Sequence, residues 1–334
     1  MSWENNLWPE WQIESEIGSG SYGKVYRIRR QDIGGTFYAA LKVISVPRND
    51  EEVRSLRNSH MNQNQIVEYY RRFARKMAQE FAVMERLKGN TNIVSYEDHK
   101  IVPKPNGIGV DVLIRMELLT PMSSIVINGE CGEAEAVRIG IDMCNALAVC
   151  EREGIIHRDI KPGNIFISNH GNYKLGDFSI ARMDSTYQSE RSPQGTYAYM
   201  APEMFSGKSY DKTIDIYSLG LILYRLLNNG RAPFLPDPPT ALTPVMMEEA
   251  NNRRLRGETF RAPINASAEL SRIILKACAY QSIDRYRSAE ELRADLEAYK
   301  MLLPADAVNH SKRNASAANS DPAMRSFFAT AGDL

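Results

Sequence analysis

Two short polar runs restrict this chain more than any other feature. The first is His-Arg-Asp-Ile-Lys-Pro-Gly-Asn at positions 157–164, and the second, Asp-Phe-Ser, begins at Asp177, thirteen residues after Asn164. An Asp can orient a hydroxyl nucleophile, and a Lys can stabilise a phosphoryl group during transfer. An Asn and an Asp can hold Mg²⁺ through oxygen. These residue types in this spacing indicate phosphoryl-transfer chemistry.

Three further runs accompany these two in a fixed order. Gly-Ser-Gly-Ser-Tyr-Gly-Lys-Val at 18–25 comes first, Ala-Ala-Leu-Lys at 39–42 follows, and Ala-Pro-Glu at 201–203 closes the series. With these five runs the sequence resembles the eukaryotic-type Ser/Thr protein kinases from about Trp11 to Leu303. The resemblance implies an α+β, bilobal fold. Its N-lobe is a small five-stranded antiparallel sheet with one long helix, and its C-lobe is larger and mainly helical.

The resemblance and the composition along the chain predict the domain boundaries. Residues 1–10 form an N-terminal extension, and the kinase domain spans 11–303, with an N-lobe at 11–117, a hinge at 117–121 and a C-lobe at 122–303. Residues 304–334 are rich in Ala, Ser, Asn and Asp and lose the apolar period of the preceding helix. Such a segment cannot offset its ordering entropy, so a disordered tail is expected.

Local patterns predict the elements of each lobe. Short β-rich runs indicate strands at 11–18, 24–30, 37–45, 93–102 and 110–118, with a hairpin turn at 33–36. An apolar stripe with helical period indicates a long helix at 65–87, and the polar residues 47–64 before it indicate a loop or a loosely held extra helix. The C-lobe is expected to contain helices at 133–153, 215–227, 269–279 and 289–302, and short strands at 165–168 and 173–176.

The glycine-rich run at 18–23 has two possible interpretations. A dinucleotide-binding fingerprint would require a helix directly after the glycines. Residues 25–29 instead alternate as a strand does, which favours a strand–turn–strand flap over phosphates. Gly18, Gly20 and Gly23 would then let backbone N–H groups approach the phosphates without obstruction by a Cβ atom.

Lys42 lies in an apolar run and, by resemblance, contacts the α- and β-phosphates of ATP and needs a buried acidic partner. Three glutamates of the 65–87 helix are candidates. Glu80 falls inside the apolar stripe, about 40° from its centre, whereas Glu85 lies about 100° away and Glu68 is on the opposite face. A carboxylate on an apolar face is costly unless it is paired. Glu80 is therefore the predicted partner.

The resemblance assigns the remaining roles in the active site. Asp159 is the base or hydroxyl-orienting acid, Lys161 acts with Lys42 and Asn164 in catalysis, and Asn164 and Asp177 are the Mg²⁺ ligands. By resemblance, Ile17, Val25 and Ala40 would cover the adenine from above, and Phe166 would lie beneath it. The full expected nucleotide-binding set is Ile17, Gly18, Gly20, Gly23, Val25, Ala40, Lys42, Glu80, Met116, Glu117 and Phe166.

An activation segment is expected at residues 181–194, where four serine and threonine side chains, Ser185, Thr186, Ser189 and Ser192, could be phosphorylated. Thr186 is the favoured site. Arg158 resembles the arginine that docks such a phosphate, although a surface ion pair is the alternative. Thr196 resembles the threonine that bridges the catalytic Asp and Lys in Ser/Thr kinases.

Three residues are expected to support the site, and one departs from the family pattern. Glu203 and Arg285 resemble a buried ion pair of the family, and Asp215 resembles the acid at a helix start that braces the catalytic run. A negative charge at that position also suits the helix dipole. Ser179 replaces the glycine of Asp-Phe-Gly, and serine reaches glycine-type conformations only at a cost of roughly 1 kcal/mol or more. The metal ligand itself is retained.

Composition excludes several classes of protein. The formal net charge is zero, so no bulk field draws the chain to nucleic acid or anionic lipid. The longest apolar run, at 219–227, is too short to span a bilayer, and the first residues lack the pattern of a signal peptide. The four cysteines form no Cys-x-x-Cys pair and the five histidines show no metal-binding spacing. Free thiols in a reducing, cytoplasmic compartment are expected.

The sequence thus predicts a Ser/Thr protein kinase that transfers the γ-phosphoryl group of Mg-ATP to protein substrates, itself included. A pseudokinase scaffold is one alternative, but Lys42, Asp159 and Asp177 are all present. A small-molecule phosphotransferase is another. Ala-Pro-Glu at 201–203 and Gly-Thr at 195–196 argue against it, because they resemble a platform for protein substrates. The oligomeric state is not predicted.

Overall fold

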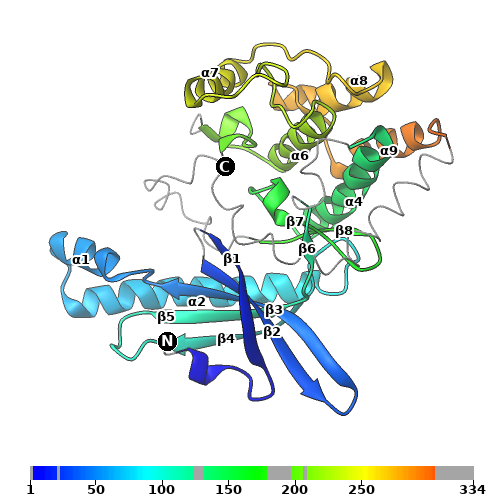
Figure 1. The fold of residues 1–334 in the computed structure, drawn as a ribbon. Coiled ribbons are helices and arrows are strands. Elements are labelled where there is room, and N and C mark those ends of the chain that lie inside the picture. The colour runs from blue at the N-terminus through cyan, green and yellow to red at the C-terminus, as the bar shows by residue number, and fades with distance from the viewer. Residues whose placement is uncertain (1–2, 21–22, 123–130, 179–196, 206–208, 305–334) are drawn as a thin grey trace.

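The computed structural model describes residues 3–20, 23–122, 131–178, 197–205 and 209–304. At positions 6, 20, 76 and 78–80 it describes the backbone only. Figure 1 shows a sheet with one long helix beside it and, across a short connection, a helical part with a small second sheet. This arrangement confirms the predicted α+β, bilobal fold.

The N-lobe sheet has five strands, all antiparallel to their neighbours, in the order β1-β2-β3-β5-β4. The strands are β1 (Gln12–Gly20), β2 (Gly23–Asp32), β3 (Gly35–Val46), β4 (Tyr96–Pro103) and β5 (Val110–Met116). Ile33 and Gly34 form the turn between β2 and β3, and the backbone N–H of Gly34 donates to Asp32 Oδ1 at 2.7 Å. All five predicted strands are present.

The long helix α2 (Gln63–Leu87) begins at a capping box, in which Asn62 and Gln65 each accept a hydrogen bond from the other's backbone N–H. Its predicted apolar stripe faces the sheet: Ile66, Tyr70 and Met77 are at most 2% exposed. A second helix, α1 (Asp50–Asn58), precedes it and buries Val53. The polar stretch before α2 therefore contains an extra helix, one of the two predicted possibilities.

The two faces of the sheet have different covers. Because side chains alternate along a strand, Val112 and Ile114 of β5 pack with α2, whereas Leu113 points to the other face. That other face is covered by the chain's three tryptophans, Trp3, Trp8 and Trp11, each at most 8% exposed. Residues 3–8, expected as an extension, thus complete the N-lobe core.

Trp8 has polar as well as apolar partners. Its Nε1–H donates to Asp98 Oδ2 at 2.6 Å, and Lys100 Nζ and the Arg115 guanidinium lie 5.0 and 4.9 Å from the centre of its ring. A cation above an aromatic ring is attracted to the negative face of the ring's quadrupole. Trp8 therefore joins the N-terminal segment to both β4 and β5.

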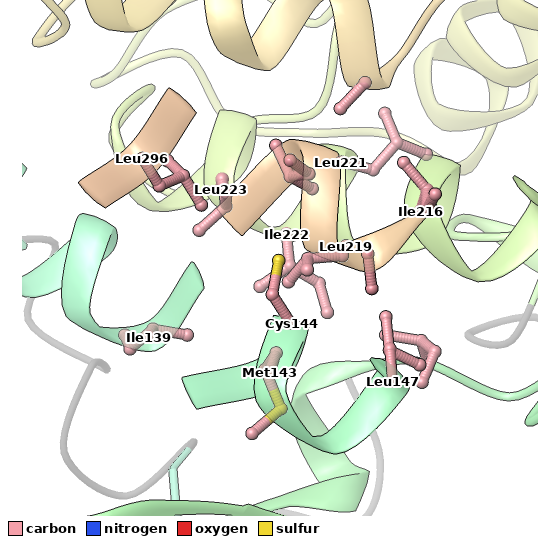
Figure 2. Close-up of a cluster of buried hydrophobic side chains, with 14 of the residues drawn as sticks. Ile139, Met143, Cys144, Leu147, Ile216, Leu219, Leu221, Ile222, Leu223 and Leu296 are labelled. Carbon is pink, nitrogen blue, oxygen red and sulfur yellow. The ribbon is translucent and has the colours of Figure 1, made fainter. Parts of the chain in front are cut away.

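The C-lobe is built on α4 (Glu133–Arg152) and α6 (Thr213–Leu226), with α8 (Ala268–Ala277) and α9 (Ala289–Lys300) packed against them. Figure 2 shows the apolar side chains of α4, α6 and α9 meeting in one core. Almost every residue of α6 is buried, which makes it the centre of this lobe. Strands β6 (Thr120–Pro121), β7 (Ile165–Ile167) and β8 (Tyr173–Leu175) form the small sheet.

Sequence reasoning missed one long element of this lobe. Helix α7 (Pro244–Leu255) begins at Thr243, whose side chain accepts from the backbone N–H of Met246, with a proline in the first turn. Within it only Ala250 and Arg254 are buried. A helix with so few buried positions carries no apolar stripe for a periodicity argument to detect.

Substitution of Trp8 by alanine should destabilise the protein strongly. Removal of a buried tryptophan leaves a cavity, and the expected loss in the free energy of unfolding is about 3 kcal/mol. Urea denaturation followed by circular dichroism measures it. Glu10→Ala, a change at an exposed neighbour, is the matched control and should alter stability by less than about 0.5 kcal/mol. Equal midpoints for the two variants would show that the N-terminal segment is not part of the core.

Candidate active site

Residues 157–164, called the catalytic loop after their predicted role, end in a short 3₁₀ turn (Pro162–Asn164) that leads into β7. Asp159 lies at its centre and is 3% exposed. Lys161 Nζ is 3.0 Å from Asp159 Oδ2, and Asn164 Nδ2 donates to the same oxygen at 3.1 Å and to the Asp159 carbonyl at 2.8 Å. The loop thus brings together the acid, the lysine and the amide that the sequence predicted.

Asp215, in the first turn of α6, holds this loop by hydrogen bonds to its backbone. Its two carboxylate oxygens accept the backbone N–H groups of His157 and Arg158 at 2.7 and 2.8 Å. Burial raises the pKa of Asp215 above its ordinary value, and the hydrogen bonds from the loop oppose that rise. The contact agrees with the bracing role that the sequence predicted.

His157 links the catalytic loop to the segment that carries Asp177. Its Nε2 is 3.0 Å from the carbonyl oxygen of Gly176, while the backbone N–H of Asp159 donates to its Nδ1 at 3.3 Å. Because Nδ1 accepts in the second contact, the ring hydrogen on Nε2 is the one that points to the Gly176 carbonyl. The ring of Phe178 packs edge-on against His157 at 4.8 Å between centres. His157 therefore has a structural role, as expected.

The ammonium group of Lys42 forms an ion pair with Asp177 Oδ1. The two side chains are 13% and 26% exposed. Burial alone would raise the pKa of Asp177, but the positive charge and hydrogen bond of Lys42 lower it below its ordinary value. Because Lys42 is on β3 and Asp177 follows β8, this pair joins the two lobes.

Two residues of the site have unusual backbone conformations. Arg158 and Asp177 have φ angles of 66° and 54°, in the left-handed region that residues with a Cβ rarely occupy. Such conformations cost about 1–3 kcal/mol each and persist only where surrounding contacts fix them. The bond from Arg158 N–H to Asp215 and the ion pair of Asp177 with Lys42 supply those contacts.

The side chains of three predicted site residues lie outside the described part of the structure. The backbone of Glu80 lies within α2, but its side chain is outside the described part, so its pairing with Lys42 stays a prediction. Thr186 and Thr196, assigned to the activation segment, also lie outside the described residues, as does Ser179.

The nucleotide-binding residues predicted on the sheet occupy connected positions. Val25 on β2 pairs with Lys42 on β3, and Ala40, two residues before Lys42, pairs with Met116 on β5. Ile17 lies where β1 is irregular, between Glu16 and Gly18. Ile17, Val25 and Met116 are all partly exposed, so they can offer apolar surface to a flat ring.

Phe166 on β7 extends this set into the C-lobe. A Cβ atom added to Gly176 would lie 2.9 Å from the Phe166 ring and 2.7 Å from Val94, closer than packing allows. Gly176 therefore lets the segment with Asp177 pass directly beside Phe166. Through Asp177 and Lys42, Phe166 is connected to the strands of the N-lobe sheet.

The β1–β2 hairpin depends on glycine at one position. Gly20 pairs with Gly23 at its end, and Gly18 pairs with Val25. Gly23 has a φ angle of 129°, and a Cβ atom there would lie 2.1 Å from the Val43 carbonyl oxygen. No other residue could bring β2 so close to β3. The strand after these glycines excludes the dinucleotide-binding interpretation, which requires a helix.

Glu117, directly after β5, has a partner that the sequence did not predict. Lys174 Nζ on β8 lies 2.6 Å from Glu117 Oε1, and the same oxygen accepts the backbone N–H of Ser95 at 2.5 Å. Glu117 thus ties the connection between the lobes to both sides. Lys174 alternates with buried Tyr173 and Leu175, a pattern that indicates a strand but gives no hint of this ion pair.

The predicted pair of Glu203 and Arg285 is present and fully formed. Arg285 donates to both carboxylate oxygens of Glu203, at 2.6 and 2.8 Å, and to the carbonyls of Ala279, Tyr280 and Thr213. Its side chain is 0% exposed. A bidentate pair of this kind fixes the Ala-Pro-Glu turn against the late helices.

Comparison with known proteins agrees with this geometry. A family model described as protein kinase domain matches residues 11–295. The serine/threonine-protein kinase PknB of Mycolicibacterium smegmatis is 34% identical over 233 residues, which cover 68% of this chain and 36% of that protein. The serine/threonine-protein kinase PrkC of Bacillus subtilis is 32% identical over 304 residues, which cover 90% of this chain and 42% of that protein. The chain therefore belongs to the protein kinase family.

The match concerns only part of these relatives, because the aligned region spans well under half the length of each. In the portion of the chain that the structure describes, no helix is long and apolar enough to cross a membrane.

Replacement of Arg285 by methionine should lower the free energy of unfolding by about 3 kcal/mol, because Glu203 would be left as a largely buried charge without its partner. Thermal or urea denaturation measures the loss. Arg287→Met is the matched control, since Arg287 is two residues away and exposed. A stability loss no larger than that of the control would contradict the structural role of the pair.

Proposed function

We propose that this protein is a serine/threonine protein kinase that transfers the γ-phosphoryl group of Mg-ATP to hydroxyl groups of protein substrates. The observation that carries the proposal is that two acids of the site are each held by the side chains that phosphoryl transfer requires. Asp159 is held by Lys161 and Asn164, and Asp177 is held by Lys42. The relatives' names, which specify serine/threonine-protein kinases, support the same activity.

The residues present fit a nucleotide and a divalent cation. Asp177 uses Oδ1 for Lys42 and is 26% exposed, so its second oxygen can reach a cation. Asn164 uses its Nδ2 group on Asp159, which leaves its amide oxygen as a ligand, and its backbone carbonyl accepts the N–H of Gly176 beside Asp177. Hard oxygen ligands of this kind suit Mg²⁺, which would neutralise phosphate charge when bound.

The chain's own residues account for the transfer step. The Asp159 carboxylate orients the substrate hydroxyl and receives its proton, while the hydroxyl oxygen forms a bond to the γ-phosphorus and the bond from that phosphorus to the β-phosphate oxygen breaks. ADP leaves with the electron pair of that bond. Lys161, 3.0 Å from Asp159, is placed to stabilise the charge on the transferred group. Lys42 is placed to contact the phosphates that remain on ADP.

A pseudokinase scaffold is the alternative, and the contacts argue against it. Loss of turnover in a kinase fold would follow from loss of an acid, an amide or a lysine of the site. All of these are present: Asp159 is in contact with Lys161 and Asn164, and Asp177 is in contact with Lys42.

A cytoplasmic location is part of the same proposal. All four cysteines are free and buried, and burial raises the pKa of Cys131 to about 12, so its thiol stays protonated. A chain with free thiols suits a reducing compartment. Cell fractionation with an antibody to this protein tests the location, and recovery outside the cytoplasm would contradict it.

Asp159→Asn and Asp177→Asn should each reduce phosphoryl transfer by at least about a hundredfold, because each removes a charge that acts directly on the reacting groups. Transfer of radiolabelled phosphate from γ-labelled ATP to a generic basic protein measures the rate. Asp284→Asn, at an exposed position, is the matched control and should keep the wild-type rate. Wild-type rates in a folded Asp159→Asn protein would contradict the proposed function.

The acceptor residues should be serine or threonine. Lys161, two residues after Asp159 and in contact with it, matches the Ser/Thr class and not the Tyr class. Acid hydrolysis of the labelled product, followed by separation of phosphoamino acids, should give phosphoserine or phosphothreonine. Phosphotyrosine as the main product would assign the protein to the other class.

A further inference from the structure

His99 on β4 packs its ring face to face on a side chain of α2. The ring of Phe81 lies 3.7 Å from it between centres, with 21° between the two planes. Phe81 is 3% exposed and lies with Tyr96 in the core between the sheet and α2. Because β4 is an edge strand, this stack is a direct contact between the edge of the sheet and the C-terminal part of α2.

Tyr96 holds the same ring through a hydrogen bond between its hydroxyl group and His99 Nδ1. Burial raises the pKa of Tyr96 to about 12, so the hydroxyl keeps its proton at neutral pH. A neutral imidazole can accept that hydrogen at Nδ1, whereas a protonated imidazole carries a hydrogen on both nitrogens and can only donate. Protonation of His99 would therefore leave Nδ1 as a donor toward a hydroxyl group that is itself protonated.

Asp98 precedes His99 on β4, and its carboxylate is already engaged. Its Oδ1 accepts the backbone N–H of His99 at 2.8 Å, and its Oδ2 accepts the Nε1–H of Trp8 at 2.6 Å. Because side chains alternate along a strand, Asp98 points to the tryptophan face of the sheet and His99 to the α2 face. The carboxylate therefore attracts a proton on the His99 ring only from the opposite face of the sheet.

Two charged groups lie close to this stack at the end of α2. The charge of Glu85 acts on Tyr96, and Lys88 Nζ lies 5.7 Å from the centre of the Tyr96 ring. β5 contributes Ile114, which pairs with His99 and is 1% exposed. In these surroundings burial outweighs the attraction of the neighbouring carboxylate and lowers the pKa of His99 below its ordinary value.

The stack acts on a part of α2 that matters for the proposed reaction. Glu80, the predicted partner of Lys42, directly precedes Phe81. We propose that His99 is a positioning residue: as a neutral ring it holds α2 where Glu80 can meet Lys42, and on protonation it releases this hold. The inference rests on the proposed kinase function and goes beyond it by assigning a pH-sensitive control of the rate to a residue outside the active site.

The direction of the pH effect follows from burial. A solvated histidine has a pKa of about 6.5, and the pKa of the packed His99 ring is lower. The packed state therefore binds fewer protons than a state in which the ring is released. Its advantage in free energy is complete above about pH 6.5 and falls as the pH drops from there to the pKa of the packed ring. The rate should fall in the same range of pH.

The turnover number kcat, measured with saturating ATP and a generic basic protein between about pH 5.5 and 7.5, tests the inference. His99→Phe keeps a ring on Phe81 and cannot be protonated. It should match the wild type at about pH 7.5 and exceed it increasingly below about pH 6.5, by at most about tenfold per pH unit, the limit for one proton. His170→Phe, the same change at an exposed turn, is the matched control and should follow the wild type at every pH.

A ratio of kcat between His99→Phe and the wild type that stays constant over this range would overturn the inference. A merely structural role would change the fraction of folded protein, which circular dichroism measures at each pH. It would leave kcat per folded molecule with the wild-type pH dependence, and that result also counts against a positioning role.

Hydrogen–deuterium exchange tests the hold on α2 without an assay of activity. In the wild type, amides of residues 81–87 should lose protection relative to those of α9 below about pH 6.5, after correction for intrinsic exchange, and in His99→Phe they should not. Unchanged relative protection in the wild type would contradict the inference, even if His99→Phe does not fold. If the wild type transfers no phosphate at about pH 7.5, the proposed function fails and with it the effect on rate, while exchange alone decides whether His99 holds α2.

Discussion

The carboxylate of Asp215 is the constraint on which the rest of the site depends. It is buried at the start of α6, the most deeply buried helix of the C-lobe, and accepts two consecutive backbone N–H groups of the catalytic loop. Those two hydrogen bonds fix Arg158 in a left-handed conformation, and the chain then turns so that Asp159 meets Lys161 and Asn164. A buried charge is tolerated there because it is satisfied by directional donors. The arrangement of the predicted catalytic residues is thus fixed by the C-lobe core.

The two lobes are joined by backbone hydrogen bonds of Asn92 and Val94 with Leu175 and, at the site itself, by ion pairs. Lys42 on the N-lobe sheet pairs with Asp177, and Glu117 at the end of β5 pairs with Lys174 on β8. Both pairs are partly exposed, so solvent screens them and each contributes modestly to stability. Pairs of this strength can hold the lobes in register and still permit relative motion. In the proposed kinase reaction, such motion would admit the nucleotide and release it.

Much of this arrangement could be predicted from the sequence, because the chemistry is concentrated in short runs. Asp159, Asn164 and Asp177 lie within 19 positions, and local hydrogen bonds bring them together. The five strands and α2 also follow from local pattern, since each buries one face with a clear period. The pair of Glu203 and Arg285 was predicted only through the family resemblance, because the two residues are 82 positions apart.

Features that depend on long-range packing could not be predicted. Trp3 and Trp8 belong to no periodic apolar pattern, so no local signal indicates that they cover a face of the N-lobe sheet. The residues they pack with lie as far along the sequence as Leu113. Helix α7 lacks an apolar stripe because its main buried contact is the guanidinium of Arg254. The sequence around Lys174 shows only the alternation of a strand, and its ion pair with Glu117 is recognised only when β8 is packed beside Glu117. In each case the decisive partner is far away in sequence, and only the packed structure identifies it.

Helix α6 holds two separate segments of the C-lobe, the loop of residues 157–164 and residues 197–200. α6 presents Asp215 to the catalytic loop and, one helical turn further, Ser218 to Tyr199. Because the helix is rigid and buried along almost its whole length, the distance between the two anchors cannot change without disruption of the core. Arg254 of α7 adds a third anchor, because it donates to the carbonyl oxygens of Met200 and Tyr197. α6 therefore sets the position of the 157–164 loop relative to residues 197–200, and a change at Asp215 or Ser218 is expected to displace the backbone that each of them holds.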